Sequence, residues 1–459
     1  MTSSPPATRT TQSAAARRAP GGPGSGPVER EGLPWGVLAI VALGAAALLA
    51  LLVSLVVGGA AEAPLALDPG PVVRYGLPIA KLATTLGASA AIGALLLSLL
   101  ALARDTPAYD RALDVAAAGA ALWALGAVAT GFFIFLSVFL EPITLDDRFG
   151  QLLASFFTER ELGQAWLATA LMAAVVTVLC FAVRSPALLA GVLVLAVAAV
   201  WPVAQTGHAG GTADHDAAVT AVYLHSVFAA VWVGGLLTLV LARRALGDRL
   251  GAVLARYSTL ALIAFIVVAV SGLVSAQIRV GTLEGLATPY GALLIAKVVS
   301  LVALGAFGAA YRGVLIARVQ RAVRPRASLW AIVVAELVVM GAASGIATAL
   351  ARTAPPVEEV PAEELADPTP AELLTGSPLP PPFEPWRLAT EWDLNLLWAL
   401  LAVFGAFFYL AGAWRLHRRG DRWPVHRTIL WVAGMAMLFA VTSGGFAVYE
   451  PYLFSVHML

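Results

Sequence analysis

Hydrophobic residues occupy most of the chain in long blocks, and short polar stretches separate these blocks. Because about 20 apolar residues cross a hydrocarbon core about 30 Å thick, each block predicts one membrane-spanning helix. A membrane β-barrel would instead show strictly alternating segments of about ten residues, and the sequence contains none. The pattern predicts an all-α, polytopic transmembrane helix bundle of about eleven spans. The expected spans lie near residues 34–58, 76–103, 112–140, 162–183, 186–205, 219–242, 257–277, 290–311, 328–350, 393–414 and 428–448.

The basic residues predict the orientation of these spans. Of 29 Lys and Arg residues, 21 fall in the N-terminal segment and in every second loop after it, and six fall in the other loops. The remaining two, Lys81 and Lys297, lie inside spans. Cytoplasmic loops are enriched in Lys and Arg, so the N-terminus is predicted to be cytoplasmic. We expect a multi-pass protein of the bacterial cytoplasmic membrane.

Two polar segments divide the chain. Residues 1–33 are rich in Ser, Pro, Ala, Gly and Arg, which predicts a disordered cytoplasmic tail. Residues 352–390 are rich in Pro and acidic residues, which predicts a semi-rigid external linker between two membrane modules. The expected domains are therefore 34–351 and 391–459.

Composition excludes several functional classes. Hydrophobic residues make up 59% of the chain and the net charge is +1, so nothing indicates a nucleic-acid partner. The single cysteine, Cys180, excludes a disulfide framework and a Cys-based zinc site. No nucleophile with a base, phosphate-binding loop or H-E-x-x-H motif indicates an enzyme, and we expect none.

Three of the six histidines fall within 18 residues of one another, on the predicted external side. His208 and His215 lie in a Gly-rich loop, and His225 lies about one turn inside the next expected span, on the same helix face as Trp232. Neutral imidazole is a common ligand for copper, nickel and zinc. We expect these histidines to bind metal, although each could instead be an ordinary polar residue of a loop or interface.

Three other ionisable residues lie inside expected spans, where charge is expensive and functional roles are common. Lys81 could extend its ammonium group to the membrane interface. Lys297 and Glu336 could pair with each other or with other polar groups. Such pairing would serve either as a structural clamp or as part of a permeation or proton path.

The external histidines belong to a set of motifs with a known counterpart. The set comprises His208, Leu224-His225, the segment Trp232 to Leu236, the stretch Tyr257 to Gly272, Thr288-Pro289-Tyr290-Gly291 before Lys297, and Tyr311-Arg312. It resembles the CopD/PcoD copper-resistance family of membrane proteins, best over residues 200–320. The resemblance implies passage of copper, as Cu(I) or Cu(II), across the cytoplasmic membrane toward the cytosol. It also implies the external histidines as ligands and an external copper chaperone as a partner.

A second resemblance begins after the linker. Its motifs are Glu391 to Leu397, Tyr409 to Gly412, Arg418 to Pro424, Ser443 to Gly445 and Leu453 to Leu459. They resemble the opening of the CtaG family linked to assembly of caa3-type cytochrome c oxidase, which implies oxidase subunits as partners. That family continues beyond this point, so we expect a truncated module or a fragment of a longer fusion. His457 and Met458 form a nitrogen and sulfur pair suited to Cu(I).

Three functions compete on these observations. The favoured one is copper transport and copper homeostasis or resistance. The alternative is an oxidase assembly factor that delivers copper without transporting it. A haem-binding redox membrane protein is the third, but two axial histidines would have to lie at matching depth, and only His225 lies inside a span.

Overall fold

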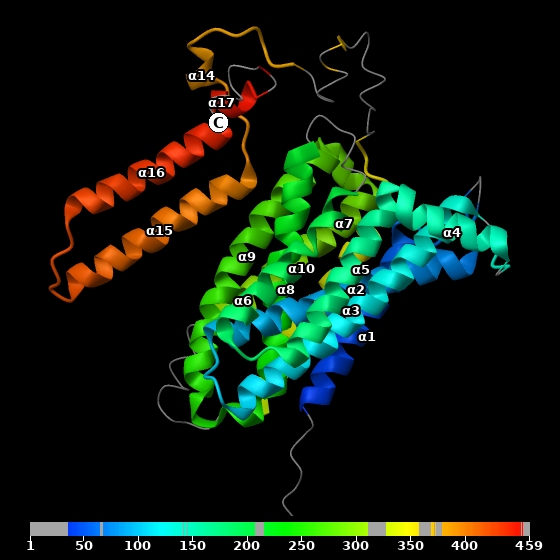
Figure 1. The fold of residues 1–459 in the computed structure, drawn as a ribbon, viewed down its shortest axis with the longest axis horizontal. Helices are drawn as coiled ribbons and strands as arrows, with labels where there is room; N and C mark the ends of the chain where they lie inside the picture. Colours follow the sequence, from blue (N-terminus) through cyan, green and yellow to red (C-terminus); the bar gives the residue numbers. More distant parts are fainter. Residues whose placement is uncertain are drawn as a thin grey trace, which may run out of the picture. The chain divides into compact units, whose positions relative to one another are not determined.

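The computed structural model describes residues 35–64, 68–140, 142–144, 146–206, 215–310, 327–357, 369, 370, 372, 379–450 and 452. The expected tail at 1–33 lies outside these residues. Within the described ranges the secondary structure is helical and contains no strand, which confirms the all-α class (Figure 1).

The long apolar helices agree with the expected spans. Ten helical stretches are long and apolar enough to cross a membrane, and one of them, Ala217–Val280, contains two helices. Counting these two separately gives the eleven spans expected. The helices are α1 (Trp35–Val57), α2 (Pro71–Leu100), α3 (Pro107–Phe139), α5 (Glu161–Ala182), α6 (Pro186–Ala198) with α7 (Trp201–Gln205), α8 (His215–Leu246), α9 (Leu250–Val280), α10 (Pro289–Ala310), α12 (Ala327–Leu350), α15 (Leu396–Arg418) and α16 (Val425–Ser443).

One helix, α4 (Asp147–Glu159), falls in a stretch that we expected to be a loop. The Asp146 carboxylate begins it by accepting a hydrogen bond from the Phe149 backbone N–H at 2.8 Å. Phe149 and Phe156 are buried, and Phe149 packs edge-on against Phe135 of α3 at 5.4 Å. The prediction was wrong here because a 13-residue amphipathic helix has no long apolar block.

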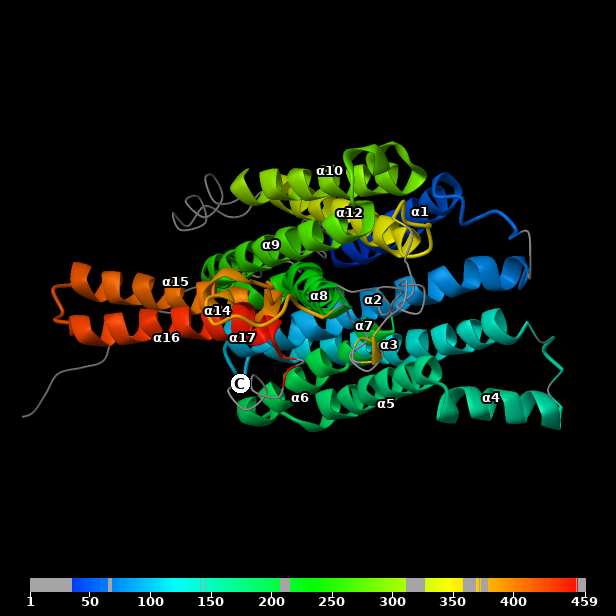
Figure 2. The same ribbon diagram turned by 90° about the horizontal axis from the view of Figure 1, so that it is seen from above.

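Helix α8 lies between α2 and α9 in the middle of the bundle, with α1, α10 and α12 to one side and α3 and α5 to the other (Figure 2). The contact between α2 and α8 is close because both helices present glycine. A Cβ atom on Gly234 would lie 1.6 Å from the Ser89 carbonyl oxygen, and one on Gly93 would lie 2.3 Å from the Gly234 carbonyl carbon. Small residues permit such approach where no hydrophobic effect drives helices together.

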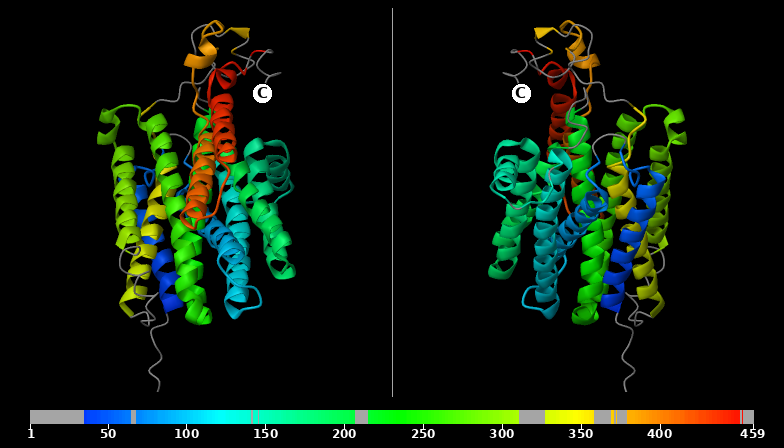
Figure 3. Two further views of the ribbon diagram at one scale, coloured as in Figure 1. Left: turned by 90° about the vertical axis from the view of Figure 1, so that its left-hand side faces the viewer. Right: turned by 90° about the vertical axis from the view of Figure 1, so that its right-hand side faces the viewer.

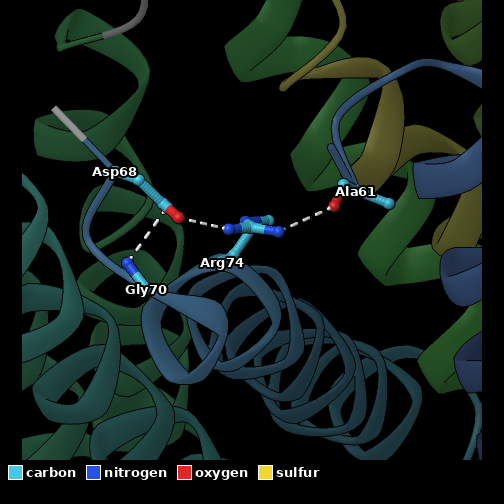
Figure 4. A network of polar contacts seen from close by, with 4 residues as sticks. All are labelled: Ala61, Asp68, Gly70 and Arg74. Atoms are coloured by element: carbon cyan, nitrogen blue, oxygen red, sulfur yellow. Dashed lines mark hydrogen bonds and ion pairs between the residues drawn. The ribbon is translucent and has the colours of Figure 1, made fainter. Parts of the chain in front are cut away.

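The connections between the helices from α1 to α12 lie at the two ends of the bundle that these helices form (Figure 3). At one end, Arg74 of α2 forms an ion pair with Asp68 at 2.5 Å and donates to the Ala61 carbonyl at 3.1 Å (Figure 4). At the other end, the Arg256 guanidinium donates to the Ala101 carbonyl at 3.4 Å. We call these the outer and inner ends, after the predicted orientation, which the structure does not test.

The fifth span is interrupted, because Pro202 near the start of α7 cannot donate a backbone hydrogen bond to α6. Two side chains donate to carbonyls at this break. The Thr169 hydroxyl donates to the Ala199 carbonyl at 3.2 Å, and the Tyr223 hydroxyl of α8 donates to the Val197 carbonyl at 3.3 Å. The break is therefore hydrogen-bonded from two neighbouring helices.

The C-terminal helices α15 and α16 form a hairpin that is tied at its open end. The Asn395 and Asp393 backbone N–H groups donate to the Ser443 hydroxyl and carbonyl, at 3.2 and 2.9 Å. Leu396 of α15 shares one apolar cluster with Leu224 of α8 and Val267 of α9. The segment after the linker therefore contacts the two helices that carry the candidate site.

The close contact between α2 and α8 predicts the effect of a single methyl group. Gly234→Ala should destabilise the protein by about 1–3 kcal/mol, because the added Cβ meets backbone that cannot move aside. Gly191→Ala on α6 is the matched control, since its Cβ would meet nothing within 4 Å. Thermal unfolding in detergent measures both. A melting temperature for Gly234→Ala equal to that of Gly191→Ala would contradict the packing.

The orientation is tested by reporters placed in short described loops. A reporter that is active only in the cytosol should be active when inserted after Gly247, between α8 and α9, and silent after Thr282, between α9 and α10. A reporter active only outside the membrane should give the reverse pattern. Equal behaviour at both positions would show that α9 does not cross the membrane.

Candidate metal site

His225 lies in the outer part of α8. Helix α8 begins at His215 rather than near residue 219, so His225 is ten residues into it, or about 15 Å along the axis. The helix thus extends further into the preceding polar stretch than the pattern of apolar residues predicted. The side chain of His225 is half-buried.

The hydrogen bonds of His225 assign its tautomer. Its Nδ1 lies 3.2 Å from the Ser271 hydroxyl oxygen on α9. The Ser271 hydroxyl lies 2.6 Å from the Val267 carbonyl and 3.3 Å from the Val268 carbonyl, so its proton is directed at its own helix and we infer that its oxygen accepts from His225 Nδ1–H. The Nε2 of a neutral ring protonated at Nδ1 carries a lone pair, which is the form that ligates a metal.

The contact between α8 and α9 holds the imidazole in place. A Cβ atom on Gly272 would lie 3.5 Å from the His225 ring, so α9 presents a flat surface to it. Two turns further along α8, Trp232 packs edge-on against Phe265 of α9 at 5.7 Å. The Tyr257 hydroxyl also donates to the Trp232 carbonyl at 2.9 Å. Trp232 is therefore a packing residue on the face that carries His225, as its spacing predicted.

The other expected ligands are not described. His208, His457 and Met458 lie outside the described residues, and so does the side chain of His215. Among the residues that the structure does describe, no group of three His, Cys, Asp or Glu side chains could hold a metal. The backbone positions of His215 and His225 are about 15 Å apart along one helix, a spacing that fits successive stops better than one shared ion.

Two intramembrane lysines each lie near a second cation. Lys297 of α10 is close enough to both His225 and Arg279 for their charges to interact. Lys81 of α2 has the same relation to Arg352, which follows α12. Burial lowers the pKa of Arg352, but a guanidinium remains charged at any physiological pH. Of these two lysines, Lys297 is the one whose charge acts on His225.

Lys297 and Glu336 do not pair in the described part of the chain, where the one ion pair joins Arg74 to Asp68. The register of the helices explains this. Leu293 of α10 shares a cluster with Leu350 and Ile346 of α12, which places Lys297 roughly 12 Å from the depth of Glu336. Glu336 is almost fully buried, at 4% exposure, in the inner half of α12.

Family comparisons match three consecutive regions of the chain. Residues 66–218 match the copper resistance protein D-like N-terminal domain, and residues 251–350 match copper resistance protein D. Residues 407–459 match the cytochrome c oxidase caa3 assembly factor. The chain joins copper resistance protein D regions to an oxidase assembly-factor region. These matches confirm both resemblances and their order, and they support a copper-related, multi-pass membrane protein.

The candidate residues fall in different matched regions of the chain. His208 and His215 fall in the copper resistance protein D-like N-terminal region, and Ser271 and Lys297 fall in the copper resistance protein D region. His225 falls between the two matched regions, and its hydrogen bond to Ser271 connects it to the second. His457 and Met458 fall in the assembly-factor region.

Similar full-length proteins are uncharacterized. Proteins of Mycobacterium bovis and Mycobacterium tuberculosis are 38% identical to this chain over 87 residues, and one of Mycobacterium leprae is 34% identical. The alignment covers 19% of this chain and 13% of each relative, so it spans only a small part of those proteins. No solved structure matches the chain.

Sequence reasoning missed Ser271 and Arg279 as neighbours of the site. Ser271 stands in an apolar run directly before Gly272, and a polar residue beside a glycine in a span is a detectable signal. Its partner, however, is 46 positions away in the sequence, and pairing it with His225 required the helix register.

The assigned tautomer predicts the effect of removing its hydrogen-bond acceptor. Ser271→Ala leaves Nδ1–H of His225 without that acceptor, so copper affinity of the purified protein should fall roughly tenfold. Ser300→Ala is the control, because the Ser300 hydroxyl bonds only within its own helix, to the Ala296 carbonyl. Copper titration in detergent measures both variants. Equal affinities for the two would show that Ser271 does not position the ring.

Proposed function

We propose that this protein carries copper across the bacterial cytoplasmic membrane toward the cytosol and catalyses no chemical reaction. The observation that supports the proposal best is His225, an imidazole inside a span whose Nδ1–H is engaged by Ser271 and whose Nε2 is left to bind metal. A histidine held in this way at membrane depth is costly unless it serves a ligand. The copper resistance protein D matches on both sides of it favour copper as that ligand.

The proposed route begins on the outer side. His208 and His215 precede α8 in the sequence and are the proposed capture ligands, and His225 is the next ligand inward. Transfer between them requires ligand exchange, which is rapid when each stop offers few imidazoles rather than a closed four-ligand cage.

An assembly role without transport is the second candidate. It is favoured by the assembly-factor match at 407–459 and by Leu396, which connects α15 to α8, the helix that carries His225, and to α9. Copper bound at His225 would then pass to the C-terminal region and on to an oxidase subunit. Co-purification of such a subunit with the full chain, lost when Leu396→Asp disrupts the apolar cluster, would support this role over transport.

A haem-binding role has less support. Within the described spans, His225 is the histidine that lies away from a helix end, since His417 and His426 lie in the terminal turns of α15 and α16. Bis-histidine ligation needs a second imidazole at the same depth on a facing helix.

Removing the histidines should reduce copper accumulation in whole cells. His225→Ala should have the larger effect and His208→Ala a smaller one, because no other histidine of the described spans lies at the depth of His225. His417→Ala at the inner end of α15 is the control, because it keeps the outer histidines intact. Unchanged accumulation in a well-expressed double variant, His208→Ala with His225→Ala, would refute the proposed route.

The same route predicts a pH dependence at its external entry. A free imidazole has a pKa near 6.5 and cannot ligate when protonated, so loop histidines lose their affinity for copper below about pH 6. Accumulation in wild-type cells should therefore fall as the external pH is lowered through this range. The residual uptake of the His208→Ala, His215→Ala double variant should change less. Parallel pH profiles for the two strains would exclude the loop histidines as ligands.

A further inference from the structure

The surroundings of His225 carry positive charge at a place where the proposed cargo is itself a cation. Val280 of α9 and Tyr290 of α10 share one buried apolar cluster, which sets the register of these two helices at the outer end beside Arg279. Gly272 lies seven residues before Arg279, and Lys297 lies seven residues after Tyr290. Each pair is therefore two turns apart on one helix face. Gly272 and Lys297 consequently lie at one level, about two turns further inward.

His225 lies at that same level. Its ring is 3.5 Å from the Cβ position of Gly272, so Lys297 approaches it from the neighbouring helix. The charge of Lys297 acts on the imidazole, and the charge of Arg279 acts on Lys297. Helices α8, α9 and α10 thus bring one imidazole, one ammonium group and one guanidinium group together in the outer part of the spans.

No acidic residue compensates these charges within the part of the chain that the structure describes. Neither Lys297 nor Arg279 belongs to its single ion pair, which joins Arg74 and Asp68. Glu284, in the short connection Leu283–Ala287 between α9 and α10, is exposed, and Glu336 lies roughly 12 Å deeper than Lys297. An uncompensated ammonium group in a span is costly, and a bare copper ion at His225 would add further positive charge beside it.

We propose that copper reaches His225 as a complex with a small monoanion, of which chloride is the simplest, and that Lys297 and Arg279 bind this anion. The inference rests on the proposed function, because it names the form in which the cargo is carried. When the complex binds, the His225 Nε2 lone pair forms a bond to copper and one bond from copper to an anion breaks. The released anion stays paired with the Lys297 ammonium group, while a second anion can remain on the copper.

The direction in which one substitution changes copper affinity separates this proposal from transport of a bare ion. If copper binds bare, Lys297→Met removes a repelling charge, and copper binding at His225 becomes tighter. If copper binds with its anion, the same substitution removes the anion's partner, and binding becomes weaker. Lys297→Arg retains the charge, and Lys81→Met removes the other intramembrane lysine, which lies beside Arg352 and away from His225.

The experiment uses the full chain in a neutral detergent under reducing conditions. Copper(I) is partitioned between the protein and a coloured copper(I) chelator, in chloride or in weakly coordinating methanesulfonate at equal ionic strength. The protein and the chelator compete for the same free copper. Formation of copper chloride complexes in solution therefore lowers the copper available to both equally and does not change the exchange constant. In the wild type and in Lys81→Met the exchange constant should favour the protein more in chloride. The exchange constant of Lys297→Met should be roughly tenfold lower than that of the wild type in chloride and should differ little between the two salts. The exchange constant of Lys297→Arg should still favour the protein more in chloride.

Two results would overturn the inference. Tighter copper binding by Lys297→Met in both salts would show that the bare ion binds and is repelled by the lysine. A wild-type exchange constant that is equal in both salts would show that no anion accompanies copper. Copper binding that persists in His225→Ala would instead remove the proposed function itself, and the inference with it. Melting temperatures of the variants separate these results from misfolding.

Discussion

Backbone hydrogen bonding in hydrocarbon is the constraint on which this structure depends. An unpaired N–H or C=O group costs several kcal/mol where no water can reach it, so each span has to be a helix that satisfies its own groups. Association between such helices then needs close contact rather than exclusion of water. The glycines of α2 and α8 provide that contact, and they fix α8 at the centre of the bundle. His225 is held at its depth because the helix that carries it is held.

Much of the fold could be predicted because each span leaves a long apolar block in the sequence. The alternation of arginine-rich and arginine-poor loops gives a second count of the spans. The features that escaped have no such block. Helix α4 carries its apolar residues on one face of 13 positions, so its composition resembles that of a loop. Helix α8 begins inside a polar stretch, so its start was predicted about one turn too late in the sequence.

In the candidate site, the sequence identifies single unusual residues but not the residues that they contact. His225 could be singled out because an ionisable residue in a span is rare. Its partner could not, because Ser271 lies 46 positions away and only the register of α8 against α9 brings the two together. The same limit explains Lys297 and Glu336. Both residues lie inside spans, but whether they lie at the same depth depends on how α10 packs against α12.

The interruption of the fifth span at Pro202 makes the contact between the end of α6 and α8 important. The Val197 carbonyl at the end of α6 accepts a hydrogen bond from the Tyr223 hydroxyl, two positions before His225 on α8. Any shift of the α6 end away from α8 would leave that carbonyl without this donor in a medium that offers no substitute. The end of α6 is therefore anchored to α8 near the first turns of that helix. A single tyrosine hydroxyl thus holds the interrupted fifth span against α8, and Tyr223→Phe would loosen that anchor while leaving every imidazole in place.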